Sequence, residues 1–411
     1  MDPGNTAWIL IATALVLFMT PGLALFYGGM VRGKNVLGML MQNLFAMGLL
    51  AVLWVAVAFS LAFGDAGNAG FIGNFDYAWL KDVGPELTDQ EFLSFLTIPF
   101  ILFCAFQMTF AIITPALITG ATADRLKFGA YAVFIGVWLV LVYAPIAHMV
   151  FAGGWLFDLG ALDFAGGAVV HMNAGAAALA LVLLIGRRKG YPDTPMQPHN
   201  LPLTVLGTGI LWFGWAGFNA GSALAADGIA GQAIMNTFLA ASAAMLGWLV
   251  VERLKDGHAT TLGGASGAVA GLVAITPCAG FVGGMAPVYI GLIAGAVCYL
   301  ALGLKKTFGF DDSLDVVAIH LVGGLVGSLL LGFFADAAIN PAVVNEGVFL
   351  GGGGSLLWDQ IVASVVTLAY SFVVSVAIGL AIDATMGLRV DDTAEDEGLD
   401  LSQHAEVAYA D

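Results

Sequence analysis

The sequence predicts an all-α integral membrane protein with eleven transmembrane helices, arranged as a five-plus-five inverted-topology repeat followed by one long C-terminal helix. Hydrophobic residues make up 60% of the chain, charged residues only 10%, and the mean hydropathy is +0.93. Soluble domains carry roughly 25% charged residues. Two further observations support this fold class: the positive charges fall in alternate loops, and one acid–histidine pattern occurs in both halves of the chain.

The apolar stretches can be followed in order along the chain. A helix crosses about 30 Å of hydrocarbon with roughly 20 apolar residues, and the stretches of that length lie near residues 7–31, 36–63, 95–120, 128–150, 165–186, 203–226, 232–251, 261–279, 285–304, 313–335 and 356–382. The first begins at Trp8 without preceding basic residues and is longer than the apolar core of a secretory signal. We therefore expect it to be a retained helix.

The positive charges define the orientation of these helices. All but one of the 13 Lys and Arg residues follow an odd-numbered stretch, and only Lys81 lies in the alternate set of loops. Short cytoplasmic loops carry an excess of Lys and Arg, so the sequence predicts an outer N-terminus and an inner C-terminus. The residues of the predicted inner set are Arg32, Lys34, Arg125, Lys127, Arg187, Arg188, Lys189, Arg253, Lys255, Lys305, Lys306 and Arg389.

We divide the chain into a membrane domain, residues 1–385, and a cytoplasmic regulatory tail, residues 386–411. Repeat one is expected near residues 7–187, repeat two near 203–335 and the eleventh helix near 356–385. The tail is acidic and holds no Lys or Arg after residue 389. It accounts for about half of the formal net charge of -16. Much of the negative charge is therefore expected in a solvated segment and not in a pore.

The acid–histidine pattern points to the candidate site. Asp163 and His171 are eight residues apart, as are Asp312 and His320, and eight helical residues rise about 12 Å. Because stretches five and ten cross in opposite directions, both histidines are expected near the middle of the bilayer, where inverted repeats place their binding sites. The alternative is that each histidine only bonds neighbouring helices together.

Two neutral imidazoles in contact form a polar track that could pass a proton, because each ring can donate and accept one hydrogen bond. An ionisable side chain at this depth is by default a candidate functional residue. For Asp163 we favour a capping or turn role with an electrostatic side effect over direct contact with a cation.

Aromatic residues at helical spacing supply further candidates. Phe106 and Phe110 are four residues apart in stretch three, and Phe218 and Ser222 are four apart in stretch six. Facing rings can close a narrow pore, and a ring face with a hydroxyl can hold a small cation. The alternatives are ordinary core packing and, for Ser222, a hydrogen bond to its own helix.

The three cysteines are isolated in apolar runs, so neither a disulfide framework nor a metal site is indicated. We predict no metal and no cofactor.

Several segments together resemble the Amt branch of the Amt/Mep/Rh family of ammonium transporters. They are FYGGMVRGKNVLGML, AFQMTFAIITPALITGATADR, GALDFAGGAVVHMNAG, PHNLPLTVLGTGILWFGWAGFNAGSA and DDSLDVVAIHLVGG. The resemblance covers nearly the whole chain, and the family's topology of eleven helices with an outer N-terminus agrees with the topology predicted from charge and hydropathy.

The resemblance implies roles for particular residues. It implies an outer ammonium-binding site, a phenyl gate beneath it and a pore lined by twin histidines and a tryptophan. The residues are Phe110, Phe151, Ser222 and Asp163 for the outer site, Phe110 and Phe218 for the gate, and His171, His320 and Trp215 for the pore. Many bacterial members have tryptophan where this chain has Phe151, a weaker cation–π partner, so we expect weaker cation recruitment.

The implied function is transport of ammonium or ammonia across the cytoplasmic membrane, with methylammonium as a possible second substrate and no enzymatic activity. Implied partners are the lipid bilayer, two further copies in a homotrimer, and a P-II signal protein at the cytoplasmic face; no nucleic acid is expected. Residues 386–390 would dock on inner loops.

Two alternatives remain. One is an ammonium sensor, or transceptor, that transports little, although a tail of 26 residues from Met386 argues against an attached output domain. The other is an intramembrane serine protease using Ser222 with a histidine, for which the sequence supplies no distinct oxyanion site.

Overall fold

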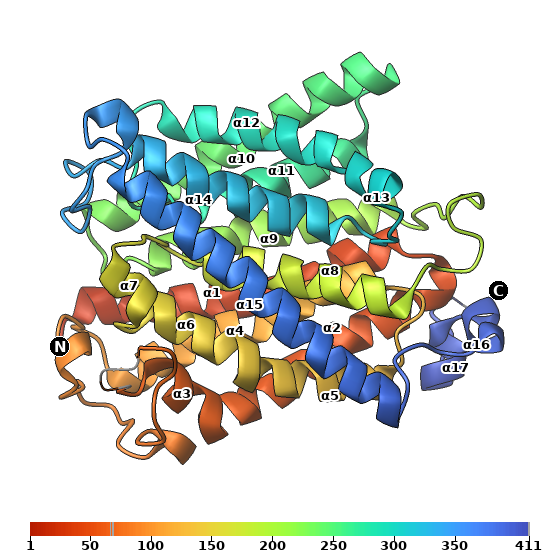
Figure 1. Cartoon of the computed structure of the whole chain (residues 1–411), viewed down its shortest axis with the longest axis horizontal. Coiled ribbons are helices and arrows are strands. Elements are labelled where there is room, and N and C mark those ends of the chain that lie inside the picture. The colour runs from red at the N-terminus through yellow and green to blue at the C-terminus, as the bar shows by residue number, and fades with distance from the viewer. Residues whose placement is uncertain (66, 68–69, 410–411) are drawn as a thin grey trace.

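The computed structural model describes residues 1–65, 67 and 70–409, so the last two residues of the predicted tail, 410–411, lie outside the described part. Within it the chain is helical and has no strand. Ten helical segments are long and apolar enough to cross a membrane, and one further apolar helix, α11, is shorter. The long helices run side by side, with α15 lying diagonally across others (Figure 1).

Each predicted stretch corresponds to a helix or to a pair of consecutive helices. In chain order these are α1 (Pro3–Met30), α2 (Val36–Leu53) with α3 (Phe59–Phe63), α4 (Phe100–Thr122), α5 (Phe128–Trp138) with α6 (Ala144–Phe151), α8 (Asn173–Ile185), α9 (Leu201–Gly221), α10 (Gly228–Asp256), α11 (Thr261–Ile275), α12 (Ala286–Ala301), α14 (Val322–Phe334) and α15 (Ser355–Thr385). The shorter helices are α7 (Trp155–Leu159), α13 (Gly303–Phe308), α16 (Asp392–Glu397) and α17 (Leu399–His404).

Several predicted boundaries differ from the observed ones by four or five residues, among them both ends of the seventh span, which runs from Gly228 to Asp256 and not from 232 to 251. Three of the differences have an evident local reason. The third span begins at Phe100 and not near 95, because Pro99 has extended backbone and precedes the helix. The sixth ends at Gly221 and not near 226, since the chain turns there and Leu224 adopts a positive φ of 56°. The eighth ends at Ile275 and not near 279, because Pro277 has no N–H to continue the helix.

Four spans contain a π-helical turn, at Trp54–Ala58, Leu139–Tyr143, Gly167–Met172 and Val317–Leu321. Such turns frequently mark functional sites. The last two hold His171 and His320, so both candidate histidines lie where the helix departs from regular α geometry.

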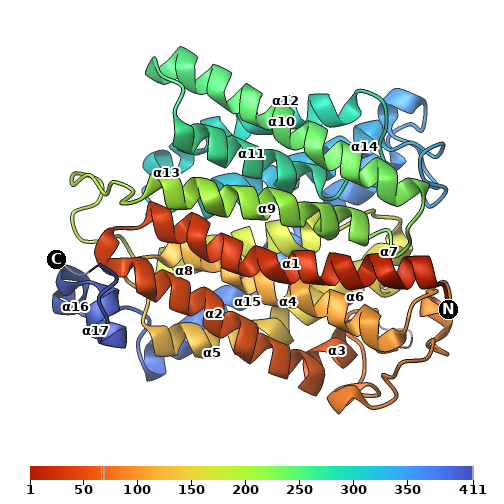
Figure 2. The ribbon, with the colours of Figure 1, turned by 180° about the vertical axis from the view of Figure 1, so that it is seen from behind.

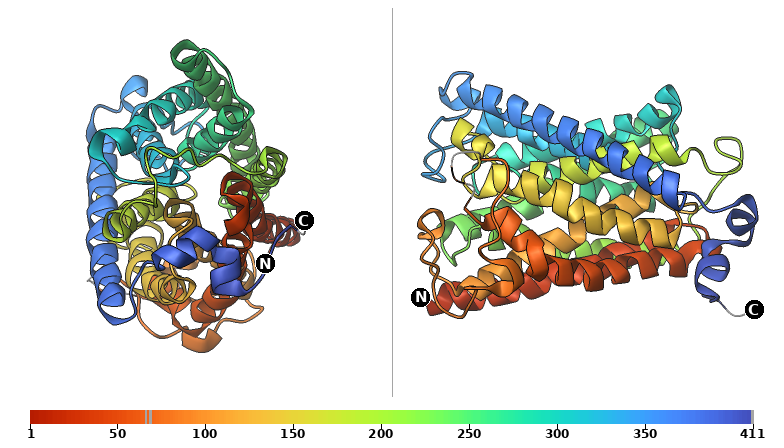
Figure 3. Two further views of the ribbon diagram at one scale, coloured as in Figure 1. Left: turned by 90° about the vertical axis from the view of Figure 1, so that its right-hand side faces the viewer. Right: turned by 60° about the horizontal axis from the view of Figure 1, so that its bottom comes forward.

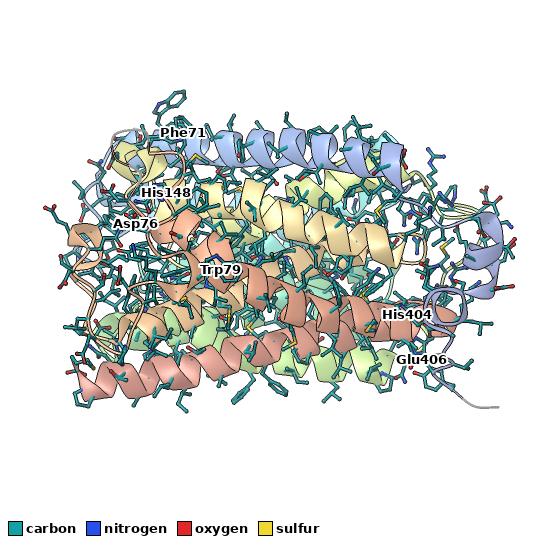
Figure 4. All side chains as sticks on the ribbon, turned by 90° about the horizontal axis from the view of Figure 1, so that it is seen from below. Phe71, Asp76, Trp79, His148, His404 and Glu406 are labelled. Carbon is teal, nitrogen blue, oxygen red and sulfur yellow. The ribbon has the colours of Figure 1, made fainter. Side chains whose placement is uncertain are left out.

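The two ends of the bundle carry different segments. The N-terminus lies at one end and the tail with α16 and α17 at the other (Figure 3). Phe71, Asp76 and Trp79 lie at the end of the N-terminus, and His404 and Glu406 at the opposite end (Figure 4). We call these the outer and inner ends, following the charge-based prediction.

The tail contacts the inner loops that the positive charges mark. The Lys127 backbone N–H donates to the Leu388 carbonyl at 2.9 Å, and the Val390 N–H donates to the Arg125 carbonyl at 3.0 Å. The Lys34 ammonium donates to the Glu395 carbonyl at 3.0 Å. Residues 386–390 therefore lie against an inner loop, as expected.

Helices from the two halves of the chain meet in two places. Helices α1 and α9 lie side by side along most of their length (Figure 2). Helix α15 packs against both α8 and α14, which belong to the first and second half. The candidate site lies between the halves, on helices that these contacts hold in place.

Candidate functional site

His171 and His320 touch at the centre of the bundle. Their Nδ1 atoms are 3.2 Å apart and their rings lie 5.3 Å apart at an interplanar angle of 28°. Both side chains are buried. A hydrogen bond between two Nδ1 atoms requires one to carry the proton and the other a lone pair, so the neutral pair takes opposite tautomers.

Each histidine is held by a π-turn that an aspartate caps. The Asp163 carboxylate accepts hydrogen bonds from the backbone N–H groups of Gly166, Gly167, Ala168 and Val169, at 2.7–3.2 Å. The Asp312 carboxylate accepts one from Val317 at 2.7 Å. These contacts match the capping role that the sequence favours for Asp163, and they fix the turns from which His171 and His320 project.

Aromatic rings continue from the histidine pair toward the outer end. The His171 ring lies nearly parallel to Phe218, at 5.9 Å and 16°, and to Trp215, at 5.5 Å and 25°. Phe218 in turn contacts Phe110, with ring centroids 4.6 Å apart. The predicted gate and pore residues therefore form one continuous set of rings.

Trp215 is positioned by a residue that the sequence reasoning missed. Its indole N–H donates to the Thr276 hydroxyl oxygen at 3.0 Å, and Thr276 directly follows α11. The Thr276 hydroxyl itself donates to the Leu272 carbonyl at 2.7 Å. No sequence pattern links the two positions, because the contact exists only once α9 and α11 are packed.

A narrow cavity of about 10 Å³ surrounds the histidine pair, roughly the space that one water requires. Apart from His171, His320 and Trp215, all of its lining side chains are hydrocarbon or thioether. The lining residues are Met19, Leu23, Phe26, Ile113, Leu117, Val170, His171, Leu211, Trp215, Phe218, Val269 and His320. A species inside this cavity can make few polar contacts.

A wider pocket of about 100 Å³ lies beyond the gate rings. It brings together Phe110, Phe151 and Ser222, three of the four residues expected at an outer site. Asp163 does not line it, but it borders a larger neighbouring cavity of about 850 Å³ that shares Phe151 and Ser222. Asp163 thus lies close to the pocket while its oxygens bind backbone amides.

The polar groups of the wider pocket are few. The Ser222 hydroxyl donates to the Phe218 carbonyl at 2.8 Å, so its oxygen lone pairs remain available as acceptors. Gln107 also lines the pocket. The sequence reasoning did not select it, although a glutamine inside an apolar stretch was a usable signal.

The order of these features runs from the wider pocket to the histidine pair. Phe110 lines the wider pocket, Phe218 lines the narrow cavity, and the two rings touch between them. Within the described ranges, His, Cys, Asp and Glu form no group of three suited to a metal ion. Fold and site together define a multi-pass membrane protein with a narrow, largely apolar cavity at a buried histidine pair.

The chain belongs to the ammonium transporter family: residues 7–409 match the model described as Ammonium Transporter Family. A curated protein of Mycobacterium tuberculosis named ammonium transporter is 50% identical, with 99% of this chain and 90% of that protein covered.

Solved structures agree with this assignment. Candida albicans Mep2 is similar with a TM-score of 0.87 and 37% identity, over 96% of this chain and 87% of that one. A structure titled Sensor Amt Protein is similar with a TM-score of 0.87 and 30% identity, over 97% and 98% of the two chains.

Proposed function

We propose that this protein transports ammonium across the cytoplasmic membrane: NH4+ is recruited at the outer pocket, loses its proton, and crosses the narrow cavity as ammonia along His171 and His320. The observation that carries the proposal is the contact between Phe110 and Phe218, which joins the outer pocket to the cavity of the histidine pair. We propose a transport role without enzymatic catalysis, in keeping with the relatives named as transporters.

Recruitment rests on the chemistry of the outer pocket. The faces of Phe110 and Phe151 attract a cation through their ring quadrupoles, and the Ser222 lone pairs accept a hydrogen bond from it. Asp163 adds a negative charge nearby without contacting the cation, since its oxygens bind backbone amides. Methylammonium has the same charged N–H group and is a second candidate substrate.

Ammonium loses its proton in this proposal because the narrow apolar cavity cannot solvate an ion. A desolvated ion in an apolar site is strongly disfavoured, whereas neutral ammonia needs only a few hydrogen-bond partners. The imidazole nitrogens of His171 and His320 supply those partners in an otherwise apolar lining. The pair also offers a route for the released proton.

We extend the proposal to the organisation of the molecule. Residues 1–385 form the transport domain and residues 386–411 a regulatory tail on the cytoplasmic face. Leu388 and Val390 form backbone hydrogen bonds with the loop at Arg125. These contacts hold the tail against the inner surface, which supports a regulatory role for it. The family resemblance suggests a homotrimer and a P-II signal protein that binds this face.

The decisive experiment measures currents on solid-supported membranes after an ammonium jump, with an internal pH readout, on purified protein in liposomes. We expect wild-type protein to respond and the His171→Leu/His320→Leu double variant to lose most conduction. The variant should elute as the same oligomer, since leucine suits the apolar lining. Wild-type flux in the double variant would contradict the proposed role of the histidines.

The two readouts, current and internal pH, distinguish net movement of charge from transport of neutral ammonia. A current that changes in His171→Asp or His320→Leu indicates net charge movement linked to the pair, whereas a pH rise without current indicates that ammonia alone crosses. Silence in both, with ammonium still changing binding of a cytoplasmic partner, would favour the sensor alternative.

A further inference from the structure

A tryptophan of the outer loop is exposed beside the second span. Trp79 is 77% exposed, although tryptophan side chains are highly buried on average. Figure 4 shows Trp79 over the outer part of the span formed by α2 and α3, on the side of the bundle. A large apolar ring is thus left uncovered by the described part of the chain.

The turn that carries Trp79 lies alongside the second span and not beyond its end. Residues Ala78–Leu80 pack against the π-turn Trp54–Ala58. That π-turn ends five residues before the span ends at Phe63, which is about 7 Å of helix. Trp79 is thereby held near the outer boundary of the hydrocarbon, the depth at which membrane proteins concentrate tryptophan.

Tyr77 fixes this turn to two spans. Its backbone N–H donates to the Ser60 hydroxyl oxygen at 2.9 Å. Its ring centroid lies 6.0 Å from that of Phe59 and 5.1 Å from that of Phe100, the first residue of α4. Tyr77 therefore faces the bundle, whereas Trp79, two residues later, is left exposed.

The backbone conformation directs the indole outward. Trp79 and Leu80 both have left-handed backbone, with φ of 60° and 59°, a conformation that bulky residues rarely adopt. Leu80 packs against the apolar core, so the two adjacent side chains have different surroundings. Such a conformation persists only where neighbouring contacts hold it, and the contacts of Tyr77 do so here.

The neighbouring face of the second span is apolar and uncovered as well. Met41, Leu44 and Val52 lie on one side of α2, and all three are exposed. On a membrane-spanning helix, an extended exposed apolar face marks contact with the membrane. Trp79 continues this face toward the outer end, so we expect lipid to cover both.

The charges beside Trp79 fit the water side of the same boundary. Lys81 is the only Lys or Arg outside the predicted inner set, and the side chains of Lys81 and Asp82 are both exposed. A lysine can lay its hydrocarbon chain along apolar surface while its ammonium stays in water. The charges of Asp76, Lys81 and Asp82 keep the segment from entering the hydrocarbon more deeply, because a desolvated ion is strongly disfavoured there.

We propose that the turn Ala78–Leu80 anchors the outer loop in the bilayer, with the Trp79 ring in the interfacial region of the outer leaflet and the Lys81 ammonium among the lipid headgroups. The partner of this surface is lipid and not a second protein. The same loop continues to Leu93 and Phe95, which line the outer pocket, so the anchored segment also forms a wall of that pocket. The proposal does not depend on ammonium conduction, because it concerns only where the loop lies.

The test places a nitroxide spin label on Trp79→Cys in the full-length protein in liposomes. It measures how often the label collides with oxygen, which concentrates in lipid, and with a water-soluble nickel chelate. The three native cysteines are buried, so the label reaches the new thiol. Val52→Cys on α2 is the lipid reference, and Val344→Cys, in the loop after α14, is the water reference. We expect the oxygen-to-nickel collision ratio at position 79 to lie between the two references and clearly above that at position 344.

The other outcomes would overturn the proposal. A ratio at position 79 equal to that at position 344 means that the ring lies in water. Low collision rates with both reagents mean that another protein surface, such as a second copy of this chain, covers the position. Should Trp79→Cys fail to elute as a single species, quenching of tryptophan fluorescence by lipids brominated near the headgroup decides: the same quenched fraction in wild type and Trp79→Phe overturns the anchor.

Discussion

At the scale of single residues, the passage is divided by a few side chains with distinct tasks. Phe110 and Phe218 separate the outer pocket from the narrow cavity, and His171 with His320 provides nearly all of the cavity's polar atoms. Asp163 lies near the outer pocket, but its carboxylate oxygens accept hydrogen bonds from the backbone of the turn that positions His171. In the proposed mechanism Phe110 serves both recruitment and gating, whereas conduction depends on His171 and His320 and can be altered separately.

Phe151 offers a substitution that should improve recruitment. Its ring lines the outer pocket, and an indole is a better cation–π partner than a phenyl ring. A whole cation–π contact contributes about 0.5–1 kcal/mol at exposed sites, so we expect Phe151→Trp to lower the half-saturating ammonium concentration by at most about fivefold, measured from current against concentration. Phe157→Trp, in the neighbouring cavity but outside the pocket, is the control. An unchanged value in Phe151→Trp would argue against Phe151 as a cation contact.

The sequence predicts some of these residues and misses others for a physical reason. His171 and His320 were predictable because an ionisable group in an apolar span is conspicuous and because the pattern occurs in both halves. Thr276 was not, since its partner Trp215 is 61 residues away and the hydrogen bond depends on helix packing. Gln107 was recognisable as a polar residue inside an apolar stretch, but only the structure shows that it lines the outer pocket.

At the scale of elements, the close approach of α1 and α9 depends on glycine. A Cβ on Gly207 would lie 2.3 Å from the Phe26 backbone nitrogen and 2.6 Å from the Gly22 carbonyl oxygen. Backbone atoms cannot move aside without shifting a helix. Without a hydrophobic force between helices in lipid, small residues at such contacts are what allow close packing.

Two glycines on α9 provide a matched test of this packing. Gly207→Ala should lower the free energy of unfolding by about 1–3 kcal/mol through overpacking. Gly209→Ala should be nearly neutral, because nothing lies within 4 Å of the added Cβ. Thermal melting of both variants in detergent measures the difference, and equal melting temperatures would show that α1 and α9 can separate at little cost.

The elements themselves were largely predictable, whereas some of their ends were not. Long apolar stretches must form helices in lipid, because backbone groups need internal partners there. Hydropathy does not register the backbone features that begin or end them, such as the extended Pro99 before α4. The π-turns were also not predicted, since no composition marks them.

At the scale of the whole molecule, a buried ionic network joins the inner loops. The Arg188 guanidinium bonds both oxygens of Asp311, at 2.8 and 2.9 Å, and lies 3.6 Å from Asp124. Arg32 bonds Asp124 at 3.0 Å, and the Arg125 side chain donates to the Gly186 carbonyl. Loops from both halves of the chain are thereby held together beneath the passage.

Asp311 in this network stays ionised at a lower pH than an ordinary aspartate does. Burial alone would raise the pKa of Asp311, but the hydrogen bonds and charge of Arg188 bring that pKa below the usual value of 3.8. A carboxyl whose pKa is lowered by folding stabilises the protein above its unfolded pKa, and the contribution is lost as pH falls through the lowered value. The pair therefore remains ionised at physiological pH.

Two Asp→Asn substitutions compare a buried with an exposed ion pair. Asp311→Asn removes the carboxylate that bonds the buried Arg188 guanidinium twice and leaves it only the more distant carboxylate of Asp124, so it should cost up to about 3–5 kcal/mol. Asp396→Asn removes the pair with Lys189, whose two side chains are 60% and 51% exposed, and should leave the melting temperature nearly unchanged because solvent screens exposed ion pairs. Melting temperatures in detergent provide the comparison. Similar melting of Asp311→Asn and wild type would mean that other contacts hold the inner loops.

The paired π-turns carry information about ancestry. A π-turn corresponds to one residue inserted into an α-helix, and both histidine-bearing turns, Gly167–Met172 and Val317–Leu321, begin four or five residues after their capping aspartate. Two independent insertions at equivalent places would be a coincidence. A π-turn present in a single ancestral half would appear at equivalent places in both halves after tandem duplication, because an odd number of spans inverts the second copy in the membrane.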